Sequence, residues 1–116
     1  MRRIEIRRRD WSDKLDELGR KHDGWLVSLD ITMKKSIGAQ REFEQMPLVG
    51  ITAEPTDHGT ISIAVEEPDG DHLTHMIHAP TQVFIETTNA GADSALEIDS
   101  ADGTKAVLHF RSGHAA

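Results

Sequence analysis

The sequence predicts an α+β or mainly β domain, in which one N-terminal helix packs on a small antiparallel barrel or sandwich of about seven strands. Apolar residues near the N-terminus recur with helical spacing. The rest of the chain alternates apolar and polar residues in short runs that turn-type residues separate. Links of hairpin length require antiparallel pairing, because parallel strands need long crossover connections.

A helix is predicted over residues 10–22. Its apolar face consists of Trp11, Leu15, Leu18 and His22, which recur with the period of a helix. Asp10 is expected to cap the N-terminus, with Asp13 in the capping-box position. The Asp23-Gly24 pair is expected to end the helix. Periodicity also places both tryptophans, Trp11 and Trp25, on inward faces, so we interpret them as anchors of the core.

The longest alternation, over residues 25–33, predicts a strand that lies centrally or bends. Further strands are predicted at 2–7, 60–66, 72–79, 82–87, 95–99 and 105–111, with a weak strand at 40–45 and an apolar stretch at 48–54. Pro47 is expected to break the chain between two of these strands, and Gly50 to permit a bend or bulge. Residues 34–38 are predicted to form a turn. A single domain over 1–111 and a disordered tail at 112–116 complete the organisation.

Composition suggests a soluble, cytoplasmic protein. The chain has 116 residues, which suits one domain, and it contains no cysteine, which removes disulfides and thiolate chemistry. No run approaches the roughly 20 apolar residues of a membrane helix. The arginine-rich start is not followed by the apolar segment of a signal peptide. We therefore expect no membrane association.

The formal net charge is -7, yet five arginines lie within residues 2–9. An acidic body repels phosphate backbones, so nucleic acid is not the expected partner. The arginines could still contact RNA or an acidic protein. The alternative interpretation is that they flank an edge strand and keep it from pairing with other chains.

Segments along most of the chain carry a family resemblance: DW at 10–11, HDGWLV at 22–27, LVGITA at 48–53, DHLTH at 71–75 and ALEIDSADGT at 95–104. Together they resemble DUF5335, a family of small bacterial single-domain proteins known only as a domain of unknown function. The resemblance implies a bacterial single domain and no catalytic residue.

The order of the predicted elements also resembles the Sm-like small β-barrels. A helix precedes five strands, and Gly50 would lie where those barrels bend. The final hairpin, at 95–111, is additional to that architecture. The RNA-binding motif of that family is absent from this sequence, so the resemblance concerns architecture alone.

Three histidines, His72, His75 and His78, fall in one predicted strand. Alternation directs His75 inward and the other two outward. His72 and His78 would lie about 20 Å apart, whereas zinc needs ligand atoms about 2 Å from one point. These three alone should form no metal site, although His58 or His109 could join from a neighbouring strand. His75, His78 and His109 are therefore the candidate residues for a ligand or metal.

The acidic stretch 66–71, EEPDGD, offers oxygen ligands for calcium, but its spacing is not that of an EF-hand. Asp-Gly is also the ordinary chemistry of a tight hairpin turn. We interpret the stretch as a turn.

No catalytic signature is present. The sequence lacks a nucleophile elbow and a glycine-rich phosphate loop, and Ser28 and Ser62 fall in strand interiors without an evident partner. We expect no catalytic residue and no cofactor. The sequence favours a non-catalytic binding or accessory module that acts through protein contacts, including contacts with its own copies. The alternatives are a histidine-lined ligand or metal site and an RNA contact through the N-terminal arginines.

Overall fold

The computed structural model describes residues 2–33, 38–55 and 59–114, with side chains described as far as Arg111. Most of the turn predicted at 34–38, and His58, lie outside these residues. Within them the chain forms one 3-10 turn, Arg8–Asp10, one α-helix and eight strands. The helix is α1 (Trp11–Lys21), and the strands are β1 (Arg2–Ile6), β2 (Trp25–Thr32), β3 (Gln40–Ala53), β4 (Ile61–Glu66), β5 (His72–Ile77), β6 (Pro80–Thr87), β7 (Asp93–Ser100) and β8 (Lys105–His114).

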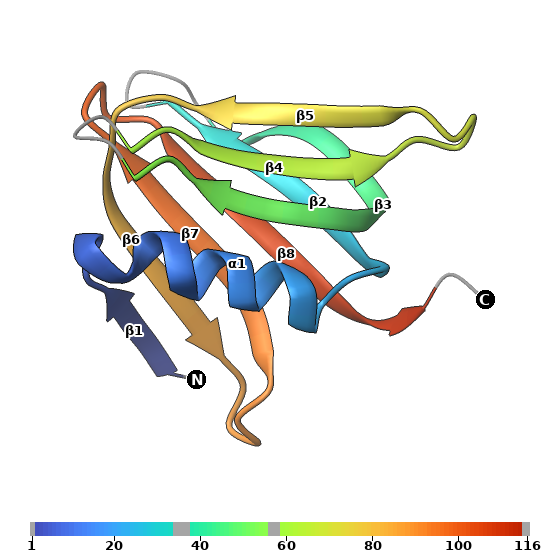
Figure 1. Ribbon diagram of the computed structural model, residues 1–116, viewed down its shortest axis with the longest axis horizontal. Coiled ribbons are helices and arrows are strands. Elements are labelled where there is room, and N and C mark those ends of the chain that lie inside the picture. The colour runs from blue at the N-terminus through green and yellow to red at the C-terminus, as the bar shows by residue number, and fades with distance from the viewer. Residues whose placement is uncertain (1, 34–37, 56–58, 115–116) are drawn as a thin grey trace.

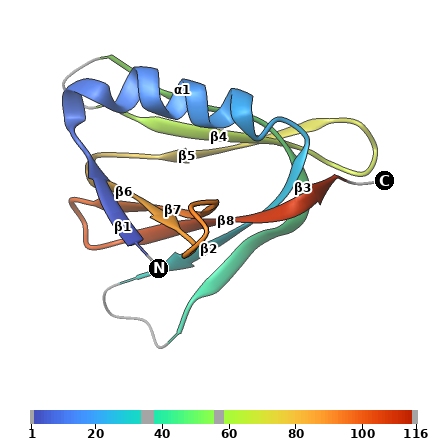
Figure 2. The same cartoon turned by 90° about the horizontal axis from the view of Figure 1, so that it is seen from below.

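The eight strands form one antiparallel sheet in the order β1-β6-β7-β8-β2-β3-β4-β5, with α1 packed against it (Figure 1). The antiparallel, mainly β prediction is confirmed. The sheet is strongly bent, so that α1, β4 and β5 lie on one side in Figure 2 and β2, β6, β7 and β8 on the other. It is not closed into a barrel, because β1 and β5 end the strand order and do not pair with each other. The barrel alternative and the Sm-like architecture are therefore wrong.

The bend lies within β3, which is 14 residues long. Its first half pairs with β2 and its second half with β4. Pro47 is predicted to end a strand, but β3 continues through it. It lies where the pairing of β3 changes from β2 to β4, a position that tolerates a residue without a backbone N–H. Register shifts mark bulges on β3, which has extra residues between its pairs with Val27 and Asp30 of β2, and again at Val49 opposite β4. Bulges bend a strand and so allow it to cross between the two halves of a sheet.

The helix begins one residue later than predicted and is capped differently. Asp10 occupies the N-cap position, but it has helical backbone angles and its side chain makes no capping hydrogen bond. The preceding 3-10 turn, Arg8–Asp10, leads the chain into the helix instead, and Trp11 Nε1 donates to the carbonyl of Ile6 at 2.9 Å. The apolar face is buried as predicted, with Trp11, Leu15, Leu18 and His22 in the interior. None of the described helices is long and apolar enough to cross a membrane.

The C-terminal strand runs further than expected. Backbone pairing of β8 continues to His114, where it meets Trp25, beyond the predicted end at Arg111. Part of the predicted tail is thus strand, and the last two residues lie outside the described part.

The helix approaches β3 very closely at Gly19. A Cβ atom placed on Gly19 would lie 2.8 Å from the backbone nitrogen of Ile51. Backbone cannot move aside as a flexible side chain can, so the absence of a Cβ is what permits this contact.

We expect Gly19→Ala to destabilise the protein by about 1–3 kcal/mol. Alanine favours a helix by about 1 kcal/mol over glycine, so the clash with β3 must exceed that gain. Urea unfolding of the variant measures the difference, with Arg20→Ala on the exposed face as the control. A Gly19→Ala protein more stable than wild type would contradict the close packing of α1 on β3.

Candidate functional site

A cavity of about 230 Å³ lies along the open edge of β5, and it is the first candidate site. Strands β2, β3 and β5 contribute to it, together with the turn between β7 and β8 and the start of β8. The lining residues are Ile31, Met33, Glu42, His75, Met76, Ile77, His78, Ser100, Asp102, Thr104 and Ala106. We call this cavity the β5 groove. Its walls combine apolar side chains with imidazoles, thioethers and two carboxylates.

The backbone of β5 presents unused hydrogen-bonding groups to one side. At the β4–β5 hairpin, Glu67 N donates to Asp71 O at 2.7 Å. Along two antiparallel strands, facing residues alternate between pairs that are hydrogen-bonded to each other and pairs that are not. Val65 faces Leu73 in the register, two residues beyond the bonded pair at the hairpin, so it belongs to a hydrogen-bonded pair as well. Counting from the hairpin, His72, Thr74 and Met76 therefore direct their N–H and C=O groups away from β4. Among the strands that the structure describes, none lies beyond β5 on that side.

The two edges of the sheet differ in charge. The edge strand β1 contains Arg2, Arg3 and Glu5, which is the usual protection against pairing with another chain. The edge strand β5, with the sequence HLTHMI, contains no lysine, arginine, aspartate or glutamate. Leu73 and Met76 are 36% and 47% exposed on it. The β5 edge therefore lacks the charges that protect β1.

The structure brings together two of the three candidate histidines. His75 is half-buried on the side of Ile77, as the alternation predicted, and His78 is exposed. Both line the β5 groove. Within the described residues, neither imidazole makes a hydrogen bond or ion pair. His72 is also exposed but does not line the groove.

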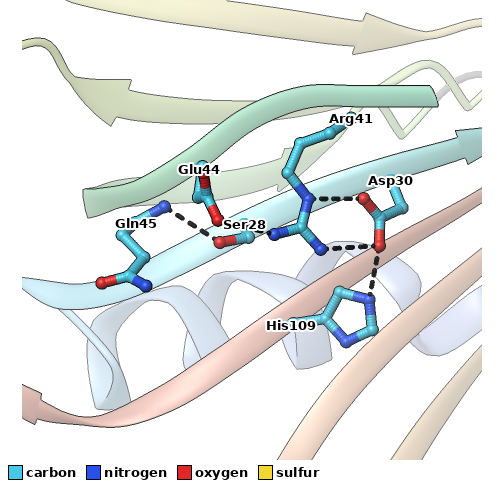
Figure 3. Close-up of polar contacts among 6 residues, drawn as sticks. All are labelled: Ser28, Asp30, Arg41, Glu44, Gln45 and His109. Atoms are coloured by element: carbon cyan, nitrogen blue, oxygen red, sulfur yellow. Dashed lines mark hydrogen bonds and ion pairs between the residues drawn. The ribbon is translucent and has the colours of Figure 1, made fainter.

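His109 lies elsewhere, on the outer face of the sheet, in a polar cluster with Asp30 and Arg41 (Figure 3). Its Nε2 lies 3.1 Å from Asp30 Oδ2, while Arg41 donates to both oxygens of the same carboxylate at 2.7 and 3.0 Å. Arg41 also reaches Glu44 at 3.2 Å. The hydrogen bonds from Arg41 lower the pKa of Asp30, although partial burial acts in the opposite direction. The cluster is a set of paired charges.

Ser28 lies opposite His109 in the register of β2 and β8, a partner that strand periodicity alone could not assign. The arrangement is not a catalytic triad. Ser28 Oγ accepts a hydrogen bond from Gln45 N at 2.9 Å, and the histidine is directed at Asp30 instead (Figure 3). Ser28 therefore supports the bulge between β2 and β3.

A second polar cluster on this outer face has no counterpart in the sequence-based predictions. Glu97 on β7 is buried, with 6% of its surface exposed, and forms an ion pair with Arg3 of β1; Lys105 Nζ lies 3.8 Å away. Asp99, two residues along, has one buried oxygen without a hydrogen-bond partner in the described structure. Burial raises the pKa of Asp99, and the charge of Glu97 raises it further.

The N-terminal arginines are partly committed to the fold. The guanidinium of Arg3 stacks on Phe84 at 3.7 Å, besides pairing with Glu97. Arg8 donates to the carbonyl of Pro80 and stacks on Trp11 at 4.5 Å. Arg2 and Arg3 lie on the edge strand β1, which agrees with the interpretation that the arginines protect an edge strand from pairing with other chains.

The acidic stretch forms the hairpin between β4 and β5, as interpreted. Gly70 adopts a φ of 93°, and Asp69 Oδ1 accepts from Asp71 N at 2.9 Å. Glu67, Asp69 and Asp71 bring ligand atoms within 4.8 Å of one another, and they are the one such group of His, Asp or Glu found in the described part of the chain. The turn geometry accounts for the grouping.

We expect Arg41→Ala to lower stability at pH 7, with the loss shrinking in acid. A carboxyl whose folded pKa is lowered contributes stability above its unfolded pKa of about 3.8, and that stability is lost as pH falls through the folded pKa. Urea midpoints at pH 7 and near pH 3 measure both values. Arg20→Ala, which breaks an exposed helix pair with Asp16, is the control and should change little at either pH.

We expect Asp99→Asn to raise stability at pH 7. The pKa of Asp99 is raised in the folded state, so stability falls as pH rises from about 3.8 through the folded pKa. Asparagine carries no charge, so the variant does not lose this stability. Its advantage over wild type should vanish at a pH low enough for Asp99 to be protonated in both the folded and the unfolded state. Thermal midpoints of the two proteins across pH 3–8 test this, and a variant less stable than wild type at pH 7 would contradict it.

The chain was compared with known proteins. It is 26% identical over 106 residues to an uncharacterised protein of Aquifex aeolicus (strain VF5), and the match covers 91% of this chain and 89% of that protein. No solved structure matches it. A model of a family of unknown function, DUF5335, matches residues 2–116. The resemblance in the sequence motifs is thus confirmed, and the chain belongs to the DUF5335 family, for which no specific function is indicated.

Proposed function

We propose that the protein is a non-catalytic binding module that accepts an extended segment of a partner protein along the edge of β5. The observation that carries this proposal is the six-residue edge strand without a charged side chain. Strand addition to such an edge is a common mode of peptide recognition, in which main-chain hydrogen bonds supply affinity and adjacent pockets supply specificity.

The β5 groove supports this proposal because it supplies the pocket beside the edge. Side chains of an added strand alternate between two faces, as in any strand. Those on one face would meet Ile31, Ile77 and Ala106, and those on the other would meet the exposed side chains of Thr74 and Met76. The exposed apolar area on β5 would then be covered.

Charge favours a basic partner over a second copy. Glu42 and Asp102 line the groove, and the whole chain carries a net charge of -7. Like charges oppose association and complementary charges favour it. We therefore propose a segment that alternates apolar residues with lysine or arginine. We also propose a cytoplasmic location, which a chain without cysteine fits.

A second candidate function is a ligand or metal site at the histidines. It is favoured by the presence of His75 and His78 in one cavity, while His109 lies apart. RNA contact through the arginines has less support, because Arg3 and Arg8 already contact Glu97, Phe84, Trp11 and Pro80.

We expect Thr74→Pro to abolish the binding of a strand while preserving the fold. Proline removes an N–H that points away from β4, and edge strands tolerate it at such positions. The probe is a capped peptide that alternates valine and lysine and matches the six residues of β5 in length. Amide chemical shifts of labelled protein should change along β5 with wild type and with Thr74→Val, which keeps the N–H, but not with Thr74→Pro.

The same peptide with glutamate in place of lysine should bind more weakly. Shift changes centred on β1, or equal binding by Thr74→Pro, would overturn the proposal. Sedimentation of the protein alone tests the other occupant: a dimer that Thr74→Pro dissociates would replace the partner segment with a second copy.

A further inference from the structure

We propose that Met33 and Met76, which both line the β5 groove, are sites of oxidation to methionine sulfoxide, and that this modification releases the partner segment from the β5 edge. The inference rests on the proposed binding of a strand and adds regulation by a peroxide to that site. The observation that carries it is the exposure of the two side chains, 54% for Met33 and 47% for Met76, at an edge strand without lysine, arginine, aspartate or glutamate.

Methionine is the oxidisable sulfur residue of this chain, which has four methionines and no cysteine. Three of the four lie in the described part, and they differ in their access to solvent. Met33 and Met76 are exposed, whereas Met46 is half-buried and packs against the core. Oxidation requires that the oxidant reach the sulfur, so susceptibility follows exposure. Hydrogen peroxide should therefore oxidise Met33 and Met76 before Met46.

The chemistry requires only the thioether and the peroxide. The sulfur lone pair attacks one oxygen of hydrogen peroxide, a sulfur–oxygen bond forms and the oxygen–oxygen bond breaks. The leaving hydroxide takes the proton of the transferred hydroxyl and departs as water. The sulfur loses two electrons and the peroxide gains them. Methionine sulfoxide reductases reverse the change, so the modification is a reversible one.

Met76 lies beside the place of an added strand. Its backbone N–H and C=O groups point away from β4, and its partner in the register of β4 is Ser62, which has a short side chain. Side chains of an added strand that face Met76 would therefore pack on its thioether, because cross-strand neighbours lie about 5 Å apart. A sulfoxide is polar and chiral, so oxidation removes this apolar contact.

Met33 affects the other face of the added strand. It lies one residue past the end of β2 and lines the groove together with Ile31, with which it shares a face by strand spacing. Oxidation of Met33 places a polar group in a wall of the groove that receives the apolar side chains of the partner. The two sulfoxides together therefore weaken binding on both faces of the strand.

Limited treatment with hydrogen peroxide tests the sites. Peptide mapping by mass spectrometry should find sulfoxide at Met33 and Met76 before Met46. Saturation with the valine–lysine peptide should slow the oxidation of Met76 in wild type, because a bound strand covers it, but not in Thr74→Pro, which should not bind the peptide. Oxidation of Met46 as fast as that of the other two, or no protection of Met76 by bound peptide, would overturn the inference.

The affinity of the oxidised protein tests the release. Binding of the same peptide, followed by amide chemical shifts, should weaken by about threefold to tenfold, because half-exposed apolar side chains no longer gain free energy from being covered. Treatment with methionine sulfoxide reductases should restore it. The variant Met33→Leu/Met76→Leu, which cannot form the sulfoxides, should bind the peptide equally before and after peroxide.

The matched control is Met46→Leu, which removes the methionine that packs against the core and should lose affinity on oxidation as wild type does. Circular dichroism verifies that each protein stays folded after treatment. Wild-type affinity that survives oxidation of Met33 and Met76, or a loss of affinity that persists in Met33→Leu/Met76→Leu, would overturn the release while leaving strand binding intact. Reduced wild type that does not bind the peptide would overturn the strand proposal and the release with it, so the two failures are distinguishable.

Discussion

The exchange of partners along β3 is the constraint on which the rest of the structure depends. This strand pairs with β2 as far as Pro47 and with β4 from Leu48 onward, so the two parts of the sheet share a continuous backbone while facing different directions. The contact of Gly19 with Ile51 places α1 against the second part of β3. The helix then covers an interior formed by both parts. Without the bend, the same strands would form a flatter sheet with no concave side for Leu15 and Leu18 to fill.

Because the sheet bends without closing, it keeps two edge strands, β1 and β5, and their side chains differ in charge. On β1, Arg3 is paired with Glu97 and stacked on Phe84, so that edge is both charged and anchored. The β5 edge borders a cavity and carries histidine, threonine and apolar residues. Natural proteins usually protect edges with charge. An edge left without charge, next to a groove with acidic walls, is where a partner segment has both hydrogen bonds and complementary charge to gain.

Periodicity predicted much of the fold, because local spacing decides which face of a strand or helix is buried. The helix at 10–22 and the hairpins around Gly70 and Gly103 follow from such patterns. The continuity of β3 through Pro47 could not be predicted, since it depends on which neighbour each half pairs with. For the same reason, the sequence identified His75 and His78 but not their shared cavity with Met33. The pairing of His109 with Asp30, 79 residues away, is set by the register of β8 alone.

The outer face and the β5 groove differ in how their polar side chains are paired. On the outer face, the carboxylates of Asp30 and Glu97 each have a cationic partner, and such pairs contribute mainly to stability and its pH dependence. A ligand there would have to displace a partner already in place. In the β5 groove, the imidazoles of His75 and His78 have no such partner among the described residues. This difference is the reason for placing the proposed binding site at the β5 groove and not on the outer face.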